Sequence, residues 1–222
     1  MKYIIMCGGE YYRWDTPRQL LEINGEPIVA RTIRLLKENG VDDIAISTNE
    51  DRFERFGVPL LKHDNYYFAI AYNFMDGYWC NCFYPTDEPT CYLFGDVVYS
   101  PAAIKTIVEY ETDDIMFFGS APPFAPNYPK PYIEPFGFKV TNTEHLRQAV
   151  EDVKRIHAEH RFDREPIAWE TWNVISRGYG GDPNWIDYTS YVHINDYTCD
   201  IDNPSEVRLL ERLAQEADDY GS

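Results

Sequence analysis

The stretch that decides the fold runs from residue 3 to residue 20 and reads YIIMCGGEYYRWDTPRQL. Its first four residues form an apolar run, which favours a buried β-strand. The pair Gly8-Gly9 follows closely, and glycine lets backbone N–H groups approach a phosphate group. Arg13 and Arg18 can neutralise charge on such a phosphate. The pattern therefore predicts a strand that leads into a phosphate-binding loop.

The rest of the chain repeats this alternation of short apolar runs and helical patterns. Runs rich in Ile, Val, Phe and Tyr predict buried strands at residues 2–7, 43–47, 59–62, 90–95, 114–119 and 136–140. Helical patterns cover residues 27–39, 101–109, 143–160 and 204–217. Alternating strands and helices favour a parallel sheet covered by helices. We therefore expect one α/β domain, residues 1–222, with a Rossmann-like three-layer αβα architecture and a mixed, mostly parallel central sheet.

The last predicted helix has a well-marked start. Asn203 can cap it, Pro204 suits its first position, and Glu206 completes an arrangement like a capping box. We expect this helix to dock firmly on the domain. Two segments, 65–89 and 121–135, are instead dense in aromatic residues or proline and predict irregular insertions near a site.

Composition limits the classes of partner. The formal net charge of −17 opposes binding to nucleic acid and to anionic membranes. No apolar run approaches the roughly 20 residues that span a bilayer, and Met1-Lys2 leads straight into a strand, so we expect a cytoplasmic protein. Five cysteines at irregular spacing favour reduced thiols. Because the chain repels a nucleoside triphosphate overall, a local arginine cluster and a divalent cation must draw that ligand in.

Aspartates at two places are candidates for holding that cation. Asp96 directly follows an apolar strand, where ligands bind in open α/β sheets, and carboxylate oxygens suit Mg²⁺. Asp200 and Asp202 precede the last helix and point the same way in an extended segment, with Asp202 the preferred ligand of the two. Simpler explanations stay open: Gly8-Gly9 as an ordinary βα turn, Asp96 as a turn residue, and Asp202 as an acid at a helix start.

The order of these features resembles the nucleotidyltransferase family with a GT-A-type fold. This family includes sugar-1-phosphate nucleotidyltransferases and cytidylyltransferases for phosphorylated alcohols. Arg13 matches its loop arginine, Pro17-Arg18 its Pro-Lys pair, residues 20–23 its apolar stretch and residues 25–28 its Gly-x-Pro turn and helix start. Asp96 matches its metal-binding aspartate, and Asp202 resembles its second metal-site acid.

The resemblance implies a Mg²⁺-dependent enzyme that transfers a nucleotidyl group from a nucleoside triphosphate to a phosphorylated acceptor and releases pyrophosphate. The implied catalytic residues are Arg13 and Arg18, and the implied metal ligands are Asp96 and Asp202. The implied nucleotide-binding residues are Cys7, Gly8, Gly9, Glu10, Arg13, Arg18, Asn73 and Asp96. Such enzymes serve the biosynthesis of nucleotide sugars or CDP-alcohols.

The acceptor site is predicted in the middle and second half of the chain. Tyr72-Asn73 is similar to a Tyr-Asn pair in phosphocholine-type cytidylyltransferases. Tryptophans in this half could belong to a cage for a quaternary ammonium group, or to core packing. The candidate acceptor residues are Glu134, Lys139, Trp169, Glu170 and Trp172. Solvated faces remain the simpler explanation for the three charged residues, and packing remains the simpler one for the two tryptophans.

Two other functions stay open at this point. A glycosyltransferase on the same fold would consume a nucleotide sugar and would not need Arg18 at a leaving pyrophosphate. A non-catalytic nucleotide-binding domain is favoured by the bulky run Glu10-Tyr11-Tyr12, which stands where the family has small residues. The sequence does not identify the base or the acceptor, and its aromatic content is compatible with a homodimer.

Overall fold

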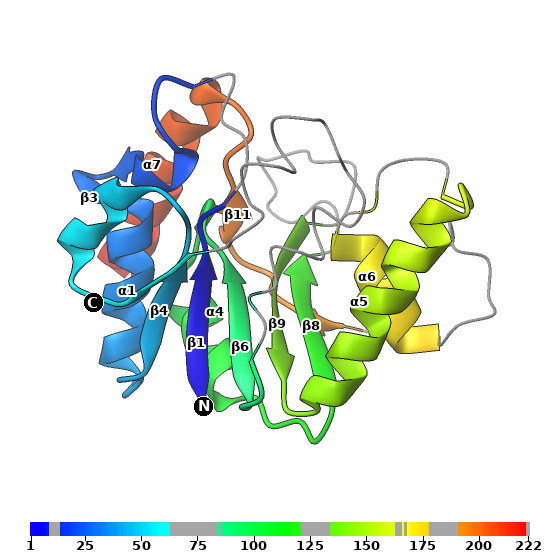
Figure 1. The fold of residues 1–222 in the computed structure, drawn as a ribbon. Coiled ribbons are helices and arrows are strands. Elements are labelled where there is room, and N and C mark those ends of the chain that lie inside the picture. The colour runs from blue at the N-terminus through cyan, green and yellow to red at the C-terminus, as the bar shows by residue number, and fades with distance from the viewer. Residues whose placement is uncertain are drawn as a thin grey trace.

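A seven-stranded sheet forms the centre of the computed structural model, which describes residues 1–8, 14–62, 84, 86–120, 134–162, 166, 168–177 and 191–220 (Figure 1). The strand order is β10-β8-β9-β6-β1-β4-β5. The strands are β1 (Lys2–Met6), β4 (Ile44–Ser47), β5 (Leu60–Leu61), β6 (Thr90–Phe94), β8 (Ile115–Ser120), β9 (Glu134–Val140) and β10 (Val192–His193).

Strand β1 lies in the middle of the parallel part of the sheet. It pairs in parallel with β4 on one side and with β6 on the other. The last four residues of β1 are buried, as the apolar run at residues 3–6 predicts for a strand covered on both faces. Strand β9 runs antiparallel to its neighbours β6 and β8. The sheet is therefore mixed and mostly parallel, which confirms the predicted fold class.

Helices cover both faces of the sheet. They are α1 (Ile28–Glu38), α4 (Pro101–Glu109), α5 (Thr143–Ala158) and α6 (Ala168–Arg177). On β9, the ring of Phe138 packs against Trp172 of α6, whereas the side chain of Lys139 reaches the end of α4. Because successive strand residues point to opposite faces, α4 and α6 lie on opposite sides of the sheet. Helix α1 packs beside α4, and α5 beside α6, which gives three layers (Figure 1).

A second hydrophobic cluster lies at one side of the sheet. It forms between the antiparallel pair β7 (Val97–Val98) and β11 (Cys199–Asp200), the hairpin β2 (Glu22–Ile23) and β3 (Glu26–Pro27), and helix α7 (Pro204–Tyr220). Its buried residues are Ile23, Ile28, Val98, Tyr197, Cys199, Ile201, Leu210 and Ala214. Helix α7 is thus docked, as predicted, and it fastens β11 beside β7.

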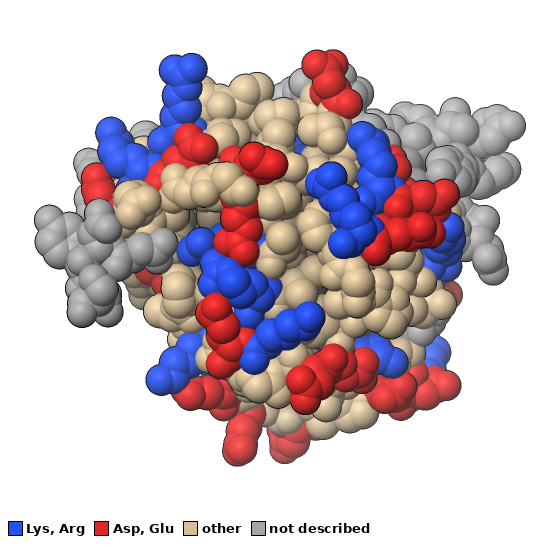
Figure 2. Space-filling model, turned by 90° about the vertical axis from the view of Figure 1, so that its left-hand side faces the viewer, with Lys and Arg blue, Asp and Glu red and all other residues tan. Residues whose placement is uncertain are grey.

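Acidic and basic side chains are interleaved on the side of the molecule that lies at the left of Figure 1 (Figure 2). Arg34 of α1 is an example, because its guanidinium pairs with Glu26 at 2.8 Å and with Glu38 at 2.9 Å. Exposed pairs of this kind contribute little to stability, about 0–1 kcal/mol. Arg34 is therefore a suitable control for changes at Arg18, whose side chain is only partly exposed. No helix among the described residues is long and apolar enough to cross a membrane.

The side chain of Lys139, on β9, binds the C-terminal end of α4. Its Nζ donates hydrogen bonds to the backbone carbonyls of Ile107, Val108 and Tyr110, at 3.0, 2.9 and 2.5 Å. Burial lowers the pKa of Lys139, although nearby Cys91 and Glu111 oppose this effect. The ammonium group satisfies carbonyls that have no partner within the helix.

We predict that Lys139→Met lowers the stability of the fold. The change keeps the length of the side chain but leaves buried carbonyls without a donor, at a cost of about 1–3 kcal/mol. Thermal unfolding followed by circular dichroism measures the effect. The matched control is Lys105→Met on α4, the helix that Lys139 contacts, because Lys105 is exposed and pairs with Glu109 at 3.8 Å. Equal midpoints for the two variants would contradict the structural role of Lys139.

Candidate active site

Strands β1 and β6 end side by side at the carboxyl edge of the sheet. The chain leaves β1 through Cys7 and Gly8, and it leaves β6 through Gly95 and Asp96. The backbone N–H of Gly95 donates to the carbonyl of Met6 at 2.9 Å. The start of the glycine loop and Asp96 are therefore neighbours, at the edge where ligands bind in open α/β sheets.

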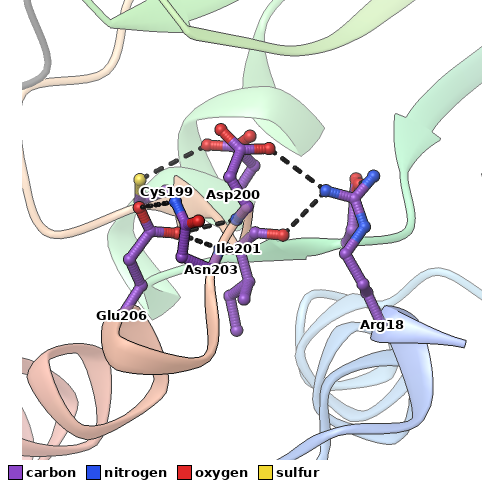
Figure 3. A network of polar contacts seen from close by, with 8 residues as sticks. Arg18, Cys199, Asp200, Ile201, Asn203 and Glu206 are labelled. Atoms are coloured by element: carbon purple, nitrogen blue, oxygen red, sulfur yellow. Dashed lines mark hydrogen bonds and ion pairs between the residues drawn. The ribbon is translucent and has the colours of Figure 1, made fainter. Parts of the chain in front are cut away.

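Arg18 links Asp96 to the segment before α7. It begins the short helix η1 (Arg18–Leu20), and its Nη2 lies 2.7 Å from Oδ2 of Asp96. Its Nη1 lies 3.1 Å from Oδ1 of Asp202 and donates to the carbonyl of Ile201 at 2.8 Å (Figure 3). Arg18 and Asp202 are 184 positions apart in sequence. The guanidinium group of Arg18 brings Asp202 and Asp96 together, and the sequence pattern assigns all three residues to one site.

The backbone fixes the position of Asp202 from both sides. The N–H of Ile201 donates to the carbonyl of Asp96 at 3.1 Å, so the two acidic segments are joined directly. On the other side, Glu206 accepts hydrogen bonds from the N–H groups of Asp202 and Asn203, at 2.7 and 2.9 Å (Figure 3). The Glu206 part of the predicted capping arrangement is present and holds Asp202 at the site, whereas the Asn203 side chain donates to Glu206 at 3.2 Å.

Glu134, Asp200 and Asp202 form an acidic cluster. One carboxylate oxygen from each of the three lies within 4.8 Å of those from the other two, and Glu134 is buried. Glu134 arrives there because β9 runs antiparallel, so its first residue lies at the edge where β6 ends. Clustered carboxylate oxygens are the donors that hard cations such as Mg²⁺ prefer. Both Asp200 and Asp202, between which the sequence left the choice open, belong to this cluster.

Asp96 stands beside this cluster and is connected to it through Arg18. Burial lowers the pKa of Arg18, but the carboxylates of Asp96, Asp202 and Asp200 outweigh burial and leave this pKa above its ordinary value. Burial also raises the pKa of the Cys7 thiol, and the charge of Asp96 raises it further. Cys7 is buried, and both effects favour the neutral form of its thiol.

The two candidate tryptophans of the acceptor set belong to the core. Trp169 and Trp172 are 5 % and 3 % exposed, and both pack against Phe117 of β8 with ring centroids 4.8 and 5.4 Å away. Glu170, between them on α6, is also buried. Their rings fill the layer between the sheet and α6, so the structure supports the packing explanation for Trp169 and Trp172 over the cage.

The structure separates the other two acceptor candidates. Glu134 lies at the carboxyl edge in the acidic cluster, whereas Lys139 lies five residues further along β9, with its side chain at the end of α4. The sequence pattern predicts Lys139 near the acceptor, and in the structure its ammonium group donates to backbone carbonyls at the end of α4. Gly9, Glu10, Arg13 and Asn73, which the sequence also assigned to the site, lie outside the described residues.

Comparisons with known proteins place this geometry in a family. A family model described as the MobA-like NTP transferase domain matches residues 3–165. The fold is similar to that of a putative glucose-1-phosphate thymidylyltransferase from Bacillus anthracis, with a TM-score of 0.56, 15% identity, and coverage of 96% of this chain and 95% of that one. It is also similar to the inositol-1-phosphate CTP transferase from T. maritima, with a TM-score of 0.57, 15% identity, and coverage of 97% and 96%.

A third similar structure is HddC from Yersinia pseudotuberculosis complexed with GMP-PN, with a TM-score of 0.52, 13% identity, and coverage of 97% and 98%. At these identities the solved structures support the fold alone. The family model covers well over half of the chain, from β1 through α5, including Arg18, Asp96 and Glu134. The chain therefore belongs to the MobA-like NTP transferase domain family.

Proposed function

We propose that this chain is a Mg²⁺-dependent nucleotidyltransferase that moves a nucleotidyl group from a nucleoside triphosphate to a sugar phosphate or phosphorylated alcohol. The observation that carries this proposal is the meeting of Arg18, Asp96 and the acidic cluster at the strand edge where the glycine loop begins. The names of the similar structures, which include a thymidylyltransferase and a CTP transferase that takes inositol-1-phosphate, support this choice of acceptor class.

The proposed reaction needs charge stabilisation more than proton transfer. An oxygen of the acceptor phosphate forms a bond to the α-phosphorus, and the bond from that phosphorus to the bridging oxygen of the β-phosphate breaks. The electron pair leaves with pyrophosphate. Because the attacking oxygen is already anionic, no general base is required, and the residues act by positioning and by offsetting charge.

Each group of residues has a separate part in this proposal. Arg18 offsets negative charge on the phosphates, together with Arg13 of the loop. Glu134, Asp200 and Asp202 would hold Mg²⁺, and their oxygen donors fit that ion. When bound, the ion supplies positive charge to the triphosphate. Asp96 fixes the guanidinium of Arg18 at 2.7 Å and lies at the edge of the same site.

The direct test is a substrate panel. Purified protein is incubated with Mg²⁺, one of CTP, UTP, TTP or GTP, and one of several sugar phosphates or phosphorylated amino alcohols, and pyrophosphate release is measured. We expect release with at least one pair. We also expect Arg18→Ala to cost about 2.7–4 kcal/mol of transition-state stabilisation, the size found for a lost oxyanion donor.

The other outcomes of the panel contradict the proposal in distinct ways. No release from any pair, with folded protein that still binds a triphosphate, would identify a non-catalytic nucleotide-binding domain. Consumption of a nucleotide sugar without pyrophosphate, with little loss in Arg18→Ala, would identify a glycosyltransferase instead.

A further inference from the structure

The guanidinium of Arg18 occupies the space between carboxylates that a metal–triphosphate complex must approach. It is a bridge with one nitrogen on Asp96, at 2.7 Å, and the other on Asp202, at 3.1 Å. The same nitrogen that faces Asp202 also donates to the carbonyl of Ile201. All three acceptors lie at the site, so Arg18 is held by the residues that the proposed reaction needs.

The charge balance explains why a cation is needed at this place. Four carboxylates, those of Asp96, Glu134, Asp200 and Asp202, gather at one edge of the sheet. The Arg18 side chain is 25% exposed and that of Asp96 is 20% exposed, so solvent screens their interaction only partly. Without Arg18, the four negative charges would repel one another at short range.

We infer that Arg18 is an internal counter-cation that keeps free metal ions from binding until a triphosphate is present. In the nucleotide-free protein Arg18 neutralises Asp96 and Asp202 and competes with a divalent cation for them. When a metal–triphosphate complex binds, its metal ion replaces Arg18 as the positive partner of the carboxylates. Its phosphates then become the negative partners of Arg18. The arginine then transfers from the carboxylates to the phosphates. The inference rests on the proposed function, since it assigns the order in which that site is filled.

An arginine suits this exchange better than a lysine. Its planar fork carries two nitrogens that can contact two separate carboxylates at once, or two oxygens of one phosphate. The ammonium of a lysine is a point charge, and it lacks the two forked nitrogens with which Arg18 contacts two carboxylates. Arg18→Lys keeps the positive charge, but it should compete less strongly with a divalent cation for the carboxylates of Asp96 and Asp202.

The test is the affinity of the protein for Mn²⁺ alone, measured by electron paramagnetic resonance of the free ion. We expect Arg18→Gln to bind Mn²⁺ at least about tenfold more tightly than the unmodified protein, which corresponds to about 1.4 kcal/mol. Arg18→Lys should fall between the two. The control is Arg34→Gln, which removes an exposed arginine that also bridges two carboxylates, away from the site. It should leave Mn²⁺ affinity unchanged.

A second measurement separates competition from a purely structural role. Inorganic tripolyphosphate, which carries no base, should strengthen Mn²⁺ binding in the unmodified protein much more than in Arg18→Gln, because only the former has the arginine to contact it. Thermal unfolding gives an independent readout: saturating Mg²⁺ should stabilise Arg18→Gln more than the unmodified protein. Circular dichroism of both Arg18 variants shows whether they are folded.

Two results would overturn the inference. One is equal Mn²⁺ affinity in folded Arg18→Gln, in Arg18→Lys and in the unmodified protein. The other is an equal increase in Mn²⁺ affinity on addition of tripolyphosphate in the two Arg18 variants and the unmodified protein. These results are independent of catalysis: failure of the substrate panel with the metal titrations as expected would refute the proposed reaction and leave the counter-cation role standing.

Discussion

Replacing Asp202 with asparagine is expected to lower kcat for pyrophosphate release by about 10²–10³-fold, the usual loss when one preorganised electrostatic partner is removed from an active site. The substitution takes one negative charge from the acidic cluster and one of the two ion pairs from Arg18. It retains the backbone N–H that donates to Glu206 at 2.7 Å, so the start of α7 should keep its cap.

Dependence on Mg²⁺ shows which carboxylates hold the ion. We expect Asp202→Asn and Asp200→Asn to raise the Mg²⁺ concentration for half-maximal rate, because both residues belong to the cluster with Glu134. Asp96→Asn should lower the rate with a smaller shift in that concentration, since Asp96 contacts Arg18. A shift for Asp96→Asn as large as for Asp202→Asn would instead make Asp96 a ligand, as the resemblance implied.

The matched control for this series is Asp51→Asn. Asp51 is exposed and pairs with Lys62 at 2.6 Å, remote in sequence from every residue of the cluster. Its replacement removes the same charge and should change neither kcat nor the requirement for Mg²⁺. If Asp202→Asn behaved like Asp51→Asn, the acidic cluster would have no part in the reaction.

The longer strands and helices were predictable because their buried faces require a recognisable pattern of apolar residues in the local sequence. A strand covered on both faces, such as residues 3–6, must be apolar throughout. Helix α1 carries its apolar residues on one side and is followed, after its C-cap Asn39, by Gly40 with a φ of 78°. The two-residue strands β7 and β11 leave no comparable mark. Their pairing is stabilised by the second hydrophobic cluster, whose buried members come from residues 23–28, 98 and 197–214.

The site was predictable only where a residue stands next to a recognisable element. Asp96 follows a buried strand and Asp202 precedes a marked helix start, and Arg18 joins them. The place of Glu134 depends on the direction of β9, which no spacing in the sequence records, because a strand run has the same pattern in both directions. For the same reason Lys139, on the same strand, was expected near the site.

Alanine at Gly137 is expected to destabilise the fold more than alanine at any exposed glycine. Gly137 lies in β9 between β6 and β8, and a Cβ there would lie 2.3 Å from the carbonyl oxygen of Tyr92. That oxygen belongs to a buried strand and can move only if the sheet moves. Forcing extra atoms into a packed interior costs about 1–3 kcal/mol or more, out of a typical total of about 5–15 kcal/mol.

Gly95→Ala is the informative comparison with Gly137→Ala, because it affects both the stability of the fold and the position of Asp96 in the site. A Cβ at Gly95 would lie 2.6 Å from the carbonyl oxygen of Met6 and 2.5 Å from Sγ of Cys7. Relief of these contacts requires the end of β6 to move away from β1, and Asp96 is the next residue. Gly95→Ala should therefore lose both stability and activity, whereas the surviving folded fraction of Gly137→Ala should keep its activity per folded molecule.

Two further variants distinguish steric contact from backbone strain. Gly40→Ala has open space around its Cβ but a φ of 78°, so it should cost only the conformational penalty of about 1–2 kcal/mol. Adding Cys7→Ala to Gly95→Ala removes the sulfur contact and should restore part of the lost stability. Unfolding in urea measures all four variants. If Gly137→Ala cost no more than Gly40→Ala, the close approach of β9 to β6 would not be what requires glycine there.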